Sequence, residues 1–338
     1  MQNDRPSITR WLQNNWLELL LLGILVLALY WAGRTVIALL PKAAPEPAGV
    51  PTMSAVDSLE SPSETPDGAT PARRFFDGTI AQGYVGSQVA LGPRAVGTSG
   101  HKAVSELIVD ELNRSGWLVE ESPFDLGGIP MKNLIAKTGS GNAGLVIIAS
   151  HYDTSPVADL DPGIENRDSP VPGANDGGSG TAVLLELARI MDQDSLNSEV
   201  WLAFLDGHYD PRGLTGEPIS AGATFLAQNL STEPDAVVLI DLAGDADQLL
   251  LIDGNSDPDL SRELWDIGER LGYSRWFVPE TEPSFDNGVF DFRSRDIPAA
   301  NIVDADYTFL RTSQDTTDKI RASSLDRVGR VLQEYLEN

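Results

Sequence analysis

The feature that most restricts the fold of this chain is the alternation of short apolar segments with amphipathic ones. In the segment 101–117, Val104, Leu107, Ile108 and Leu112 recur at helical spacing on one face. Strands that are apolar throughout and separated by helices are typical of a mostly parallel sheet between helical layers. We therefore predict an α/β fold, a three-layer sandwich with a mixed, mostly parallel central sheet. The predicted strands are 144–150, 199–207, 235–244 and 297–306, and the further predicted helices are 179–193, 223–230, 259–273 and 323–338.

Polar residues stand near the carboxyl end of each predicted strand. In α/β sheets, reactive groups gather in the loops at the carboxyl ends of the strands. Such loops begin here at Ser150, Asp206, Asp241 and Asp304, and the segment VPGANDGGSG with Asp176 precedes a predicted helix. The tripeptide His-Tyr-Asp occurs in two of these loops, at 151–153 and 208–210, although the chain has 3 histidines in all. We find no internal repeat of domain size, so a gene duplication does not explain the pair.

The composition of the chain limits which partners and metal ligands are possible. The 50 acidic and 24 basic residues give a formal charge of -26, which repels phosphate groups, so we expect no nucleic-acid partner. The absence of cysteine from the sequence excludes disulfides, thiolate metal sites and cysteine nucleophiles. A metal ion must therefore be held by histidine and carboxylate side chains.

The first 72 residues have a different character from the rest. After a short tail, 1–15, the apolar segment 16–40 is long enough to span a hydrocarbon layer of roughly 30 Å, and Trp16 on one side and Tyr30 with Trp31 on the other resemble interfacial anchors. We predict an uncleaved transmembrane helix rather than a signal peptide, because no small-residue cleavage site follows it. The segment 41–72, rich in Pro, Ser and Ala, is a predicted linker to a domain at 73–338. We expect a single-pass membrane protein with its large domain on the extracytoplasmic side.

The order of motifs from about residue 90 to 338 resembles metallopeptidase family twenty-eight, the zinc aminopeptidases and glutaminyl cyclases. GPRAVGTSGH is similar to the entry motif of the family, and IIASHYDTSP to the strand that leads to its first histidine ligand. VPGANDGGSGTAVLLELAR is similar to the motif of the bridging aspartate, and VLIDLAG to the strand with a further aspartate. The final segment, 284–320, follows the family almost step for step. The resemblance implies an α/β sandwich around a mixed sheet and a site for two zinc ions.

Carried over residue by residue, the resemblance leaves one side of that site intact. It implies that His151 is a metal ligand, that Asp153 orients it, and that Asp176 bridges two ions. Asp241 is then the remaining ligand on the His151 side.

The other side of the site is substituted. The family usually has Asp-Gly-Glu-Glu, with a general-base glutamate and a ligand glutamate, where this chain has His208 and Tyr209. The last histidine ligand is replaced by Arg311, and a further family histidine by Asn287. Arginine has no lone pair to donate and stays charged, so it repels a second cation.

These substitutions lead to specific expectations for the site. We expect at most one zinc ion, on His151, Asp176 and Asp241, and an ion pair between Arg311 and Asp176. His208 is either a weak candidate for the general base or a partly buried polar side chain. Tyr209 is expected to pack or to donate a hydrogen bond, and His101 is expected on the surface.

Three functions remain open from the sequence. The first is a membrane-anchored zinc-peptidase-like domain with a degenerate, one-sided metal site and weak or no peptidase activity, which still binds the amino terminus of a peptide or protein. The second is an active aminopeptidase that uses one zinc ion. The third is a glutaminyl-cyclase-like acyltransferase. Fold does not decide between them.

Overall fold

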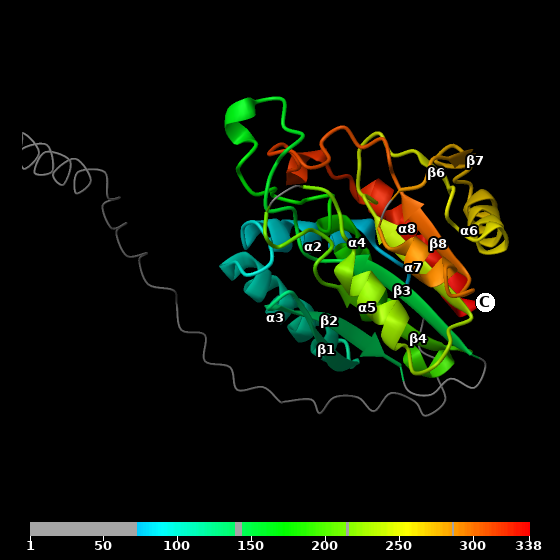
Figure 1. Cartoon of the computed structure of the whole chain (residues 1–338). Helices are drawn as coiled ribbons and strands as arrows, with labels where there is room; N and C mark the ends of the chain where they lie inside the picture. Colours follow the sequence, from blue (N-terminus) through cyan, green and yellow to red (C-terminus); the bar gives the residue numbers. More distant parts are fainter. Residues whose placement is uncertain (1–72, 139–143, 214–215, 286) are drawn as a thin grey trace, which may run out of the picture. The chain divides into compact units, whose positions relative to one another are not determined.

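The computed structural model describes residues 73–338, apart from 139–143, 214–215 and 286 (Figure 1). The described residues form one compact unit. The predicted tail, transmembrane helix and linker at 1–72 lie outside the described residues. Within the described part of the chain, none of the helices has the length and apolar character needed to cross a bilayer.

A six-stranded mixed sheet forms the centre of the domain, in the order β1-β2-β4-β3-β5-β8. The three pairings among β4, β3, β5 and β8 are parallel, whereas β2 pairs antiparallel with both β1 and β4. The prediction of a mixed, mostly parallel sheet is therefore confirmed. The strands of the sheet are β1 (Leu118–Leu126), β2 (Ile129–Lys137), β3 (Leu145–His151), β4 (Glu199–Leu205), β5 (Ala236–Asp241) and β8 (Ala299–Val303).

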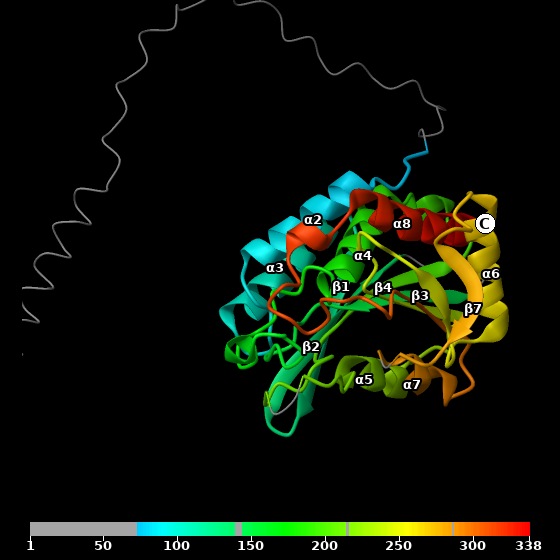
Figure 2. The ribbon, with the colours of Figure 1, turned by 90° about the horizontal axis from the view of Figure 1, so that it is seen from above.

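Helices cover both faces of this sheet, as Figure 2 shows edge-on. One face packs against five helices and the other against two. The larger layer consists of α2 (Gly78–Ala90), α3 (Ser99–Arg114), α4 (Gly178–Ile190), α6 (Pro258–Arg270) and α8 (Ala322–Glu337), and the smaller of α5 (Ala221–Asn229) and α7 (Val289–Arg293).

Alternation along the strands divides the core between these two layers. In β3, Ile148 belongs to the core on the larger layer, while Ile147 and Ala149 belong to the core on the smaller layer. In β4, Leu202 and Ala203 divide in the same way. Because both faces are covered, the interior positions of β3, β4 and β5 are apolar on both faces, which is why their sequences show no polar alternation.

Several elements were not predicted. The helix α2 has mixed polar and small residues without a clear apolar stripe, so its periodicity is weak. The hairpin β1–β2 carries charged residues on an exposed edge, and the short pair β6 (Leu250–Asp253) and β7 (Phe277–Glu282) forms a separate two-stranded parallel sheet. The β6–β7 pair joins segments that are separated in the sequence by α6, whereas α2 and the β1–β2 hairpin are partly exposed and lack a strong apolar pattern.

Candidate metal centre

The candidate site lies where three neighbouring parallel strands end. His151 is the last residue of β3 and pairs in register with Leu205 at the end of β4, while Asp241 is the last residue of β5. Because β3 lies between β4 and β5, these ends come together at one edge of the sheet. His208 follows β4 within three residues, and Asp176 precedes α4 by two. All four side chains are almost completely buried.

His151 is surrounded by carboxyl groups. Its Nε2 lies 3.3 Å from Asp176 Oδ1 and 3.4 Å from Asp241 Oδ1, while its Nδ1 lies 3.0 Å from the carbonyl oxygen of Asp153. Burial alone lowers the pKa of His151, but the charge of Asp241 and the nearby carboxyl groups of Asp153 and Asp176 outweigh it and raise this pKa well above its usual range. Without a metal ion, an imidazolium at His151 therefore balances part of the negative charge.

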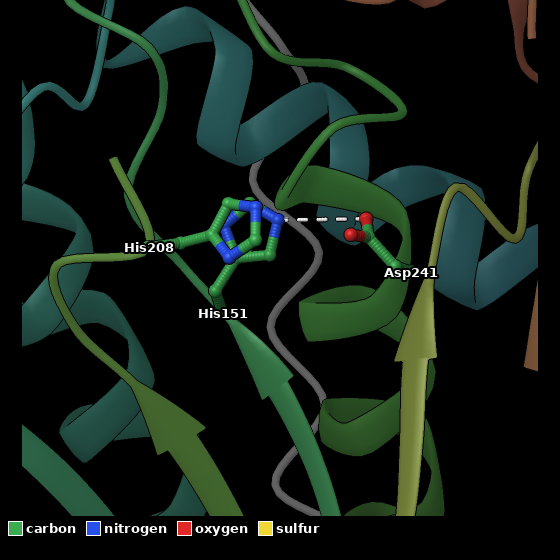
Figure 3. A group of neighbouring side chains, drawn as sticks. All are labelled: His151, His208 and Asp241. Atoms are coloured by element: carbon green, nitrogen blue, oxygen red, sulfur yellow. Dashed lines mark ion pairs between the residues drawn. The ribbon is translucent and has the colours of Figure 1, made fainter. Parts of the chain in front are cut away.

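His208 stacks on His151, with ring centroids 4.1 Å apart and an interplanar angle of 23° (Figure 3). Its Nδ1 lies 3.2 Å from Ser220 Oγ. Burial lowers the pKa of His208, and the charge of His151 lowers it further. The shifts favour a neutral His208 ring stacked on a charged His151 ring. His208 is almost completely buried in the site, and not only partly buried as the sequence suggested.

Asp153 holds the two His-Tyr-Asp loops together. Its carboxylate oxygens accept the backbone N–H groups of His208 and Tyr209, each at 3.0 Å. Its Oδ1 also lies 3.5 Å from His151 Nδ1. The structure therefore places Asp153 behind His151, in the position of an orienting group.

Tyr209 occupies the side of Asp176 where the family resemblance implies the second metal ion. Its hydroxyl donates a hydrogen bond to Asp176 Oδ2 at 2.6 Å, and the side chain is buried. Burial raises the pKa of Tyr209 well above its usual range, and the charges of Asp176 and Asp241 add to the shift, so the phenol keeps its proton. Tyr209 donates a hydrogen bond here, as the sequence predicted.

The predicted ion pair between Arg311 and Asp176 is wrong. Among the described residues, the guanidinium of Arg311 pairs instead with Asp159, at 2.8 Å, and with Glu217, at 2.9 Å. Arg311 has a left-handed backbone conformation, with a φ of 54°, which is uncommon for residues other than glycine. Arg311 thus links the loops that carry Asp159 and Glu217 through two ion pairs. The group next to Asp176 is instead the hydroxyl of Tyr209.

The donor atoms fit a single transition-metal ion. One nitrogen or oxygen atom from each of His151, His208 and Asp241 lies within 4.8 Å of the others. Among the described residues, His151 Nε2 and Asp176 Oδ1 are buried and lack a hydrogen-bond partner of good geometry, as expected for atoms that bind a cation. Two histidines and a carboxylate are a usual ligand set for zinc. Because the two imidazole planes are nearly parallel, one ring must tilt for both lone pairs to reach the same ion.

Two supporting side chains were missed from the sequence. His101 was predicted on the surface, but its side chain is 13% exposed and its Nε2 lies 2.7 Å from Asp206 Oδ1. Asp206 also accepts the backbone N–H groups of Lys132 and Gly207, so this pair holds the loop that carries His208. Arg94 is fully buried and donates to backbone carbonyl groups of the loops that carry the aspartates. Arg94 and His101 both lie in the segment GPRAVGTSGH. Local sequence patterns do not show that this segment folds beside the site.

Comparison with known proteins agrees with this arrangement. The model of Peptidase family M28 matches residues 133–336. A glutaminyl cyclase from Bacteroides thetaiotaomicron, solved with N-acetylhistamine bound, superposes with a TM-score of 0.73 at 27% identity, over 79% of this chain and 99% of that one. A leucine aminopeptidase precursor from the same organism superposes equally well, with a TM-score of 0.73 at 26% identity, over 79% and 99% of the two chains.

Curated relatives match over shorter segments. A glutaminyl-peptide cyclotransferase from Drosophila melanogaster is 29% identical over 170 residues, or 46% of each chain. A "Probable zinc metalloprotease" from Pyrenophora tritici-repentis is 36% identical over 121 residues, which are 34% of this chain and 22% of the relative. This chain thus spans less than half the length of these two curated relatives. The family model covers most of the described domain, including every strand end that forms the site, and the chain therefore belongs to Peptidase family M28.

Proposed function

We propose that this protein is a peptidase-family domain that holds one zinc ion on one side of the ancestral site and has weak or no peptidase activity. It keeps the ability to bind the amino terminus of a peptide or protein. The observation that carries the proposal is the hydrogen bond of 2.6 Å from the Tyr209 hydroxyl to Asp176 Oδ2, where a second ion would lie. Because Asp176 Oδ2 accepts this hydrogen bond, only Asp176 Oδ1 is available to an ion, and it faces His151.

The residues that would hold zinc are His151, His208 and Asp241, and Asp176 Oδ1 lies 3.3 Å from His151 Nε2. When bound, zinc supplies Lewis acidity that polarises a carbonyl group. Asp153 keeps the Nδ1 side of His151 engaged, which directs Nε2 toward the ion. Tyr209 restrains Asp176, and His101 with Asp206 restrains the loop of His208.

The replacement of the family's general-base glutamate supports the proposal that peptidase activity is weak or absent. Proton transfer from a nucleophilic water needs an acceptor within hydrogen-bond reach of that water. The resemblance assigns this role to a glutamate at the position of His208. Here His208 is stacked on His151 and pairs with Ser220, so its nitrogen atoms are directed to the metal centre and to the protein.

The test combines metal analysis with two assays on the purified full-length chain. We expect one zinc ion per chain and no chelator-sensitive hydrolysis of aminoacyl anilides. Two zinc ions per chain, or turnover that a chelator abolishes and zinc restores, would contradict the proposal. Cyclisation of an amino-terminal glutamine peptide is measured in parallel, because the solved relatives include glutaminyl cyclases.

A variant that restores the family residues provides the positive control. The triple substitution His208→Glu, Tyr209→Glu and Arg311→His returns the general base and two ligands of the family. Because it also removes the proposed ligand His208, an ion on the His151 side would then be held with Asp176 and Asp241. We expect it to bind a second zinc ion and to gain chelator-sensitive activity. If the variant folds and binds two ions but stays inactive, further parts of the active site have been lost.

A further inference from the structure

A small void adjoins the two stacked histidines. Its volume of ≈ 10 Å³ is enough for about one water molecule or ion, and its walls include His151, His208, Asp241 and Asn287. A space of this size accepts a single ion or water and excludes an amino-acid side chain. The proposed zinc ligands thus share the walls of this void with Asn287 and with other polar residues, Ser150, Asp206 and Ser220.

Asn287 lies in the loop between β7 and α7 and is 5% exposed. Its Nδ2 donates a hydrogen bond to Asn301 Oδ1 at 2.5 Å. Among the described residues, its Oδ1 is buried and has no hydrogen-bond partner. Leaving an amide oxygen buried and unpaired is unfavourable, so this oxygen is expected to have a partner that is neither a backbone nor a side-chain donor.

We infer that Asn287 Oδ1 is the fourth protein donor to the ion held by His151, His208 and Asp241. This inference rests on the proposed function and concerns the same site. The resulting set of two imidazole nitrogens and two oxygens suits zinc, which prefers four ligands in tetrahedral geometry. Sites in which the protein supplies all four ligands are closed and structural, whereas catalytic zinc sites keep an open position.

A closed site gives the metal ion a different task. The ion fills the void and leaves no coordination position for a substrate or a nucleophile. It then joins the ends of β3, β4 and β5 to the loop before α7, which are otherwise held by hydrogen bonds. The substitution of a family histidine by Asn287 is thus part of a change from a catalytic to a structural centre.

Metal binding by variants of the full-length chain tests this role directly. Zinc affinity is measured by competition with a chromophoric chelator for the wild type, Asn287→Ala, Asn287→Asp and Asn301→Ala. We expect Asn287→Ala to weaken zinc binding at least about tenfold. Asn287→Asp keeps an oxygen donor and adds charge, so it should bind zinc at least as tightly as the wild type. Asn301→Ala is the matched control, because it removes the hydrogen-bond partner but keeps the oxygen, and its effect should be smaller than that of Asn287→Ala.

Cobalt(II) in place of zinc reports the coordination number without any assay of activity. We expect the wild type to show the intense visible absorption of a four-coordinate ion, unchanged by added azide. In Asn287→Ala, azide should enter the open position and shift the spectrum.

The outcomes separate the two proposals. If the wild type binds one zinc ion but Asn287→Ala binds it equally well, or if azide shifts the wild-type spectrum, the role of Asn287 is refuted and the proposed function stands. If the wild type binds no zinc, the proposed function itself fails. If Asn287→Ala does not fold, Asn287→Asp decides, since weaker binding than the wild type overturns the inference.

Discussion

The Tyr209 hydroxyl is the single group that most distinguishes this site from a two-metal centre. It donates to Asp176 Oδ2 at 2.6 Å inside the protein. Tyr209→Phe leaves that buried carboxyl oxygen without a donor, which is expected to lower the free energy of unfolding by about 1–3 kcal/mol. Urea denaturation in the presence of a chelator measures this loss.

Tyr152→Phe is the matched control for that change. It removes a hydroxyl that donates to the backbone carbonyl of Lys132 at 2.9 Å, a neutral hydrogen bond expected to contribute about 0.5–1.5 kcal/mol. If Tyr209→Phe costs no more than Tyr152→Phe, Tyr209 does not compensate the charge of Asp176.

Asp304 is expected to make the stability of the domain depend on pH. Burial raises the pKa of Asp304 to about 9, and the neighbouring Asp306 adds to the shift. The unfolded chain releases this proton near the ordinary pKa of about 3.9. The contribution of the group to stability is therefore fully present below about pH 4 and is lost as the pH rises to about 9.

Asn at this position cannot ionise, so Asp304→Asn should flatten that dependence. We expect the wild type to lose stability relative to the variant between pH 5 and about pH 9, as measured by urea denaturation at several pH values. Asp318→Asn is the control, because the pKa of Asp318 is lowered to about 2 by hydrogen bonds and the group is ionised throughout this range in both states. Equal slopes for the wild type and Asp304→Asn would contradict the prediction.

At the scale of elements, two helical glycines have opposite surroundings. A Cβ atom at Gly83 in α2 meets nothing within 4 Å, whereas one at Gly329 in α8 would lie 2.3 Å from ring atoms of the buried Phe76. Gly83→Ala should raise the free energy of unfolding by about 0.5–1 kcal/mol, since alanine favours a helix. Gly329→Ala should lower it by about 1–3 kcal/mol, because overpacking outweighs the same gain.

Thermal unfolding of the two variants tests this pair, and each serves as the control for the other. Both substitutions change the same residue type in the interior of a helix, so a difference between them reports packing alone. A stabilising Gly329→Ala would show that α8 and the segment before α2 are not packed closely.

The loops that carry the site depend on conformations that side chains seldom adopt. Leu242, which follows Asp241, and Ser220, which contacts His208, both have positive φ angles, of 48° and 46°. Such backbone strain persists only where surrounding contacts require it, and it often occurs at functional sites. These two residues therefore indicate that the backbone after β5 and before α5 is held in its conformation by surrounding contacts.

At the scale of the whole molecule, zinc should stabilise the domain at 73–338 by mass action. An ion that binds only the folded state adds about 2.7 kcal/mol when its free concentration is 100 times the Kd. For a domain of this size, that amount corresponds to an increase in Tm of several degrees. Scanning calorimetry with zinc and with a chelator measures the shift, and His151→Ala should abolish it. A Tm that neither zinc nor chelator changes would contradict a metal centre.

The transmembrane helix at 16–40 stays a prediction from the sequence. It predicts that the full-length chain remains with membranes after an alkaline carbonate wash, whereas residues 73–338 alone stay in the supernatant. Recovery of the full-length chain in the supernatant would contradict the anchor. The extracytoplasmic location of the domain is tested separately, by accessibility of the domain to protease in intact cells.

Local patterns in the sequence were sufficient for most of the sheet. The apolar runs predicted β3, β4, β5 and β8, because strands buried on both faces are rich in apolar residues. The strand ends indicated that His151 and Asp241 lie at one edge of the sheet, whereas the ligand roles of His151, Asp176 and Asp241 were implied by the resemblance to the family. The edge hairpin and α2 were missed because partly exposed elements are not required to be apolar.

The direction of each polar side chain was decided by the tertiary structure alone. The residue types at 208, 209 and 311 show in the sequence that one half of the site is substituted, because neither arginine nor a protonated phenol can bind zinc as histidine or glutamate does. They do not show that Arg311 pairs with Asp159 and Glu217, or that Tyr209 is the group beside Asp176. An ion pair forms with whichever acid the packed loops bring within reach, and that distance exists only once the chain has folded.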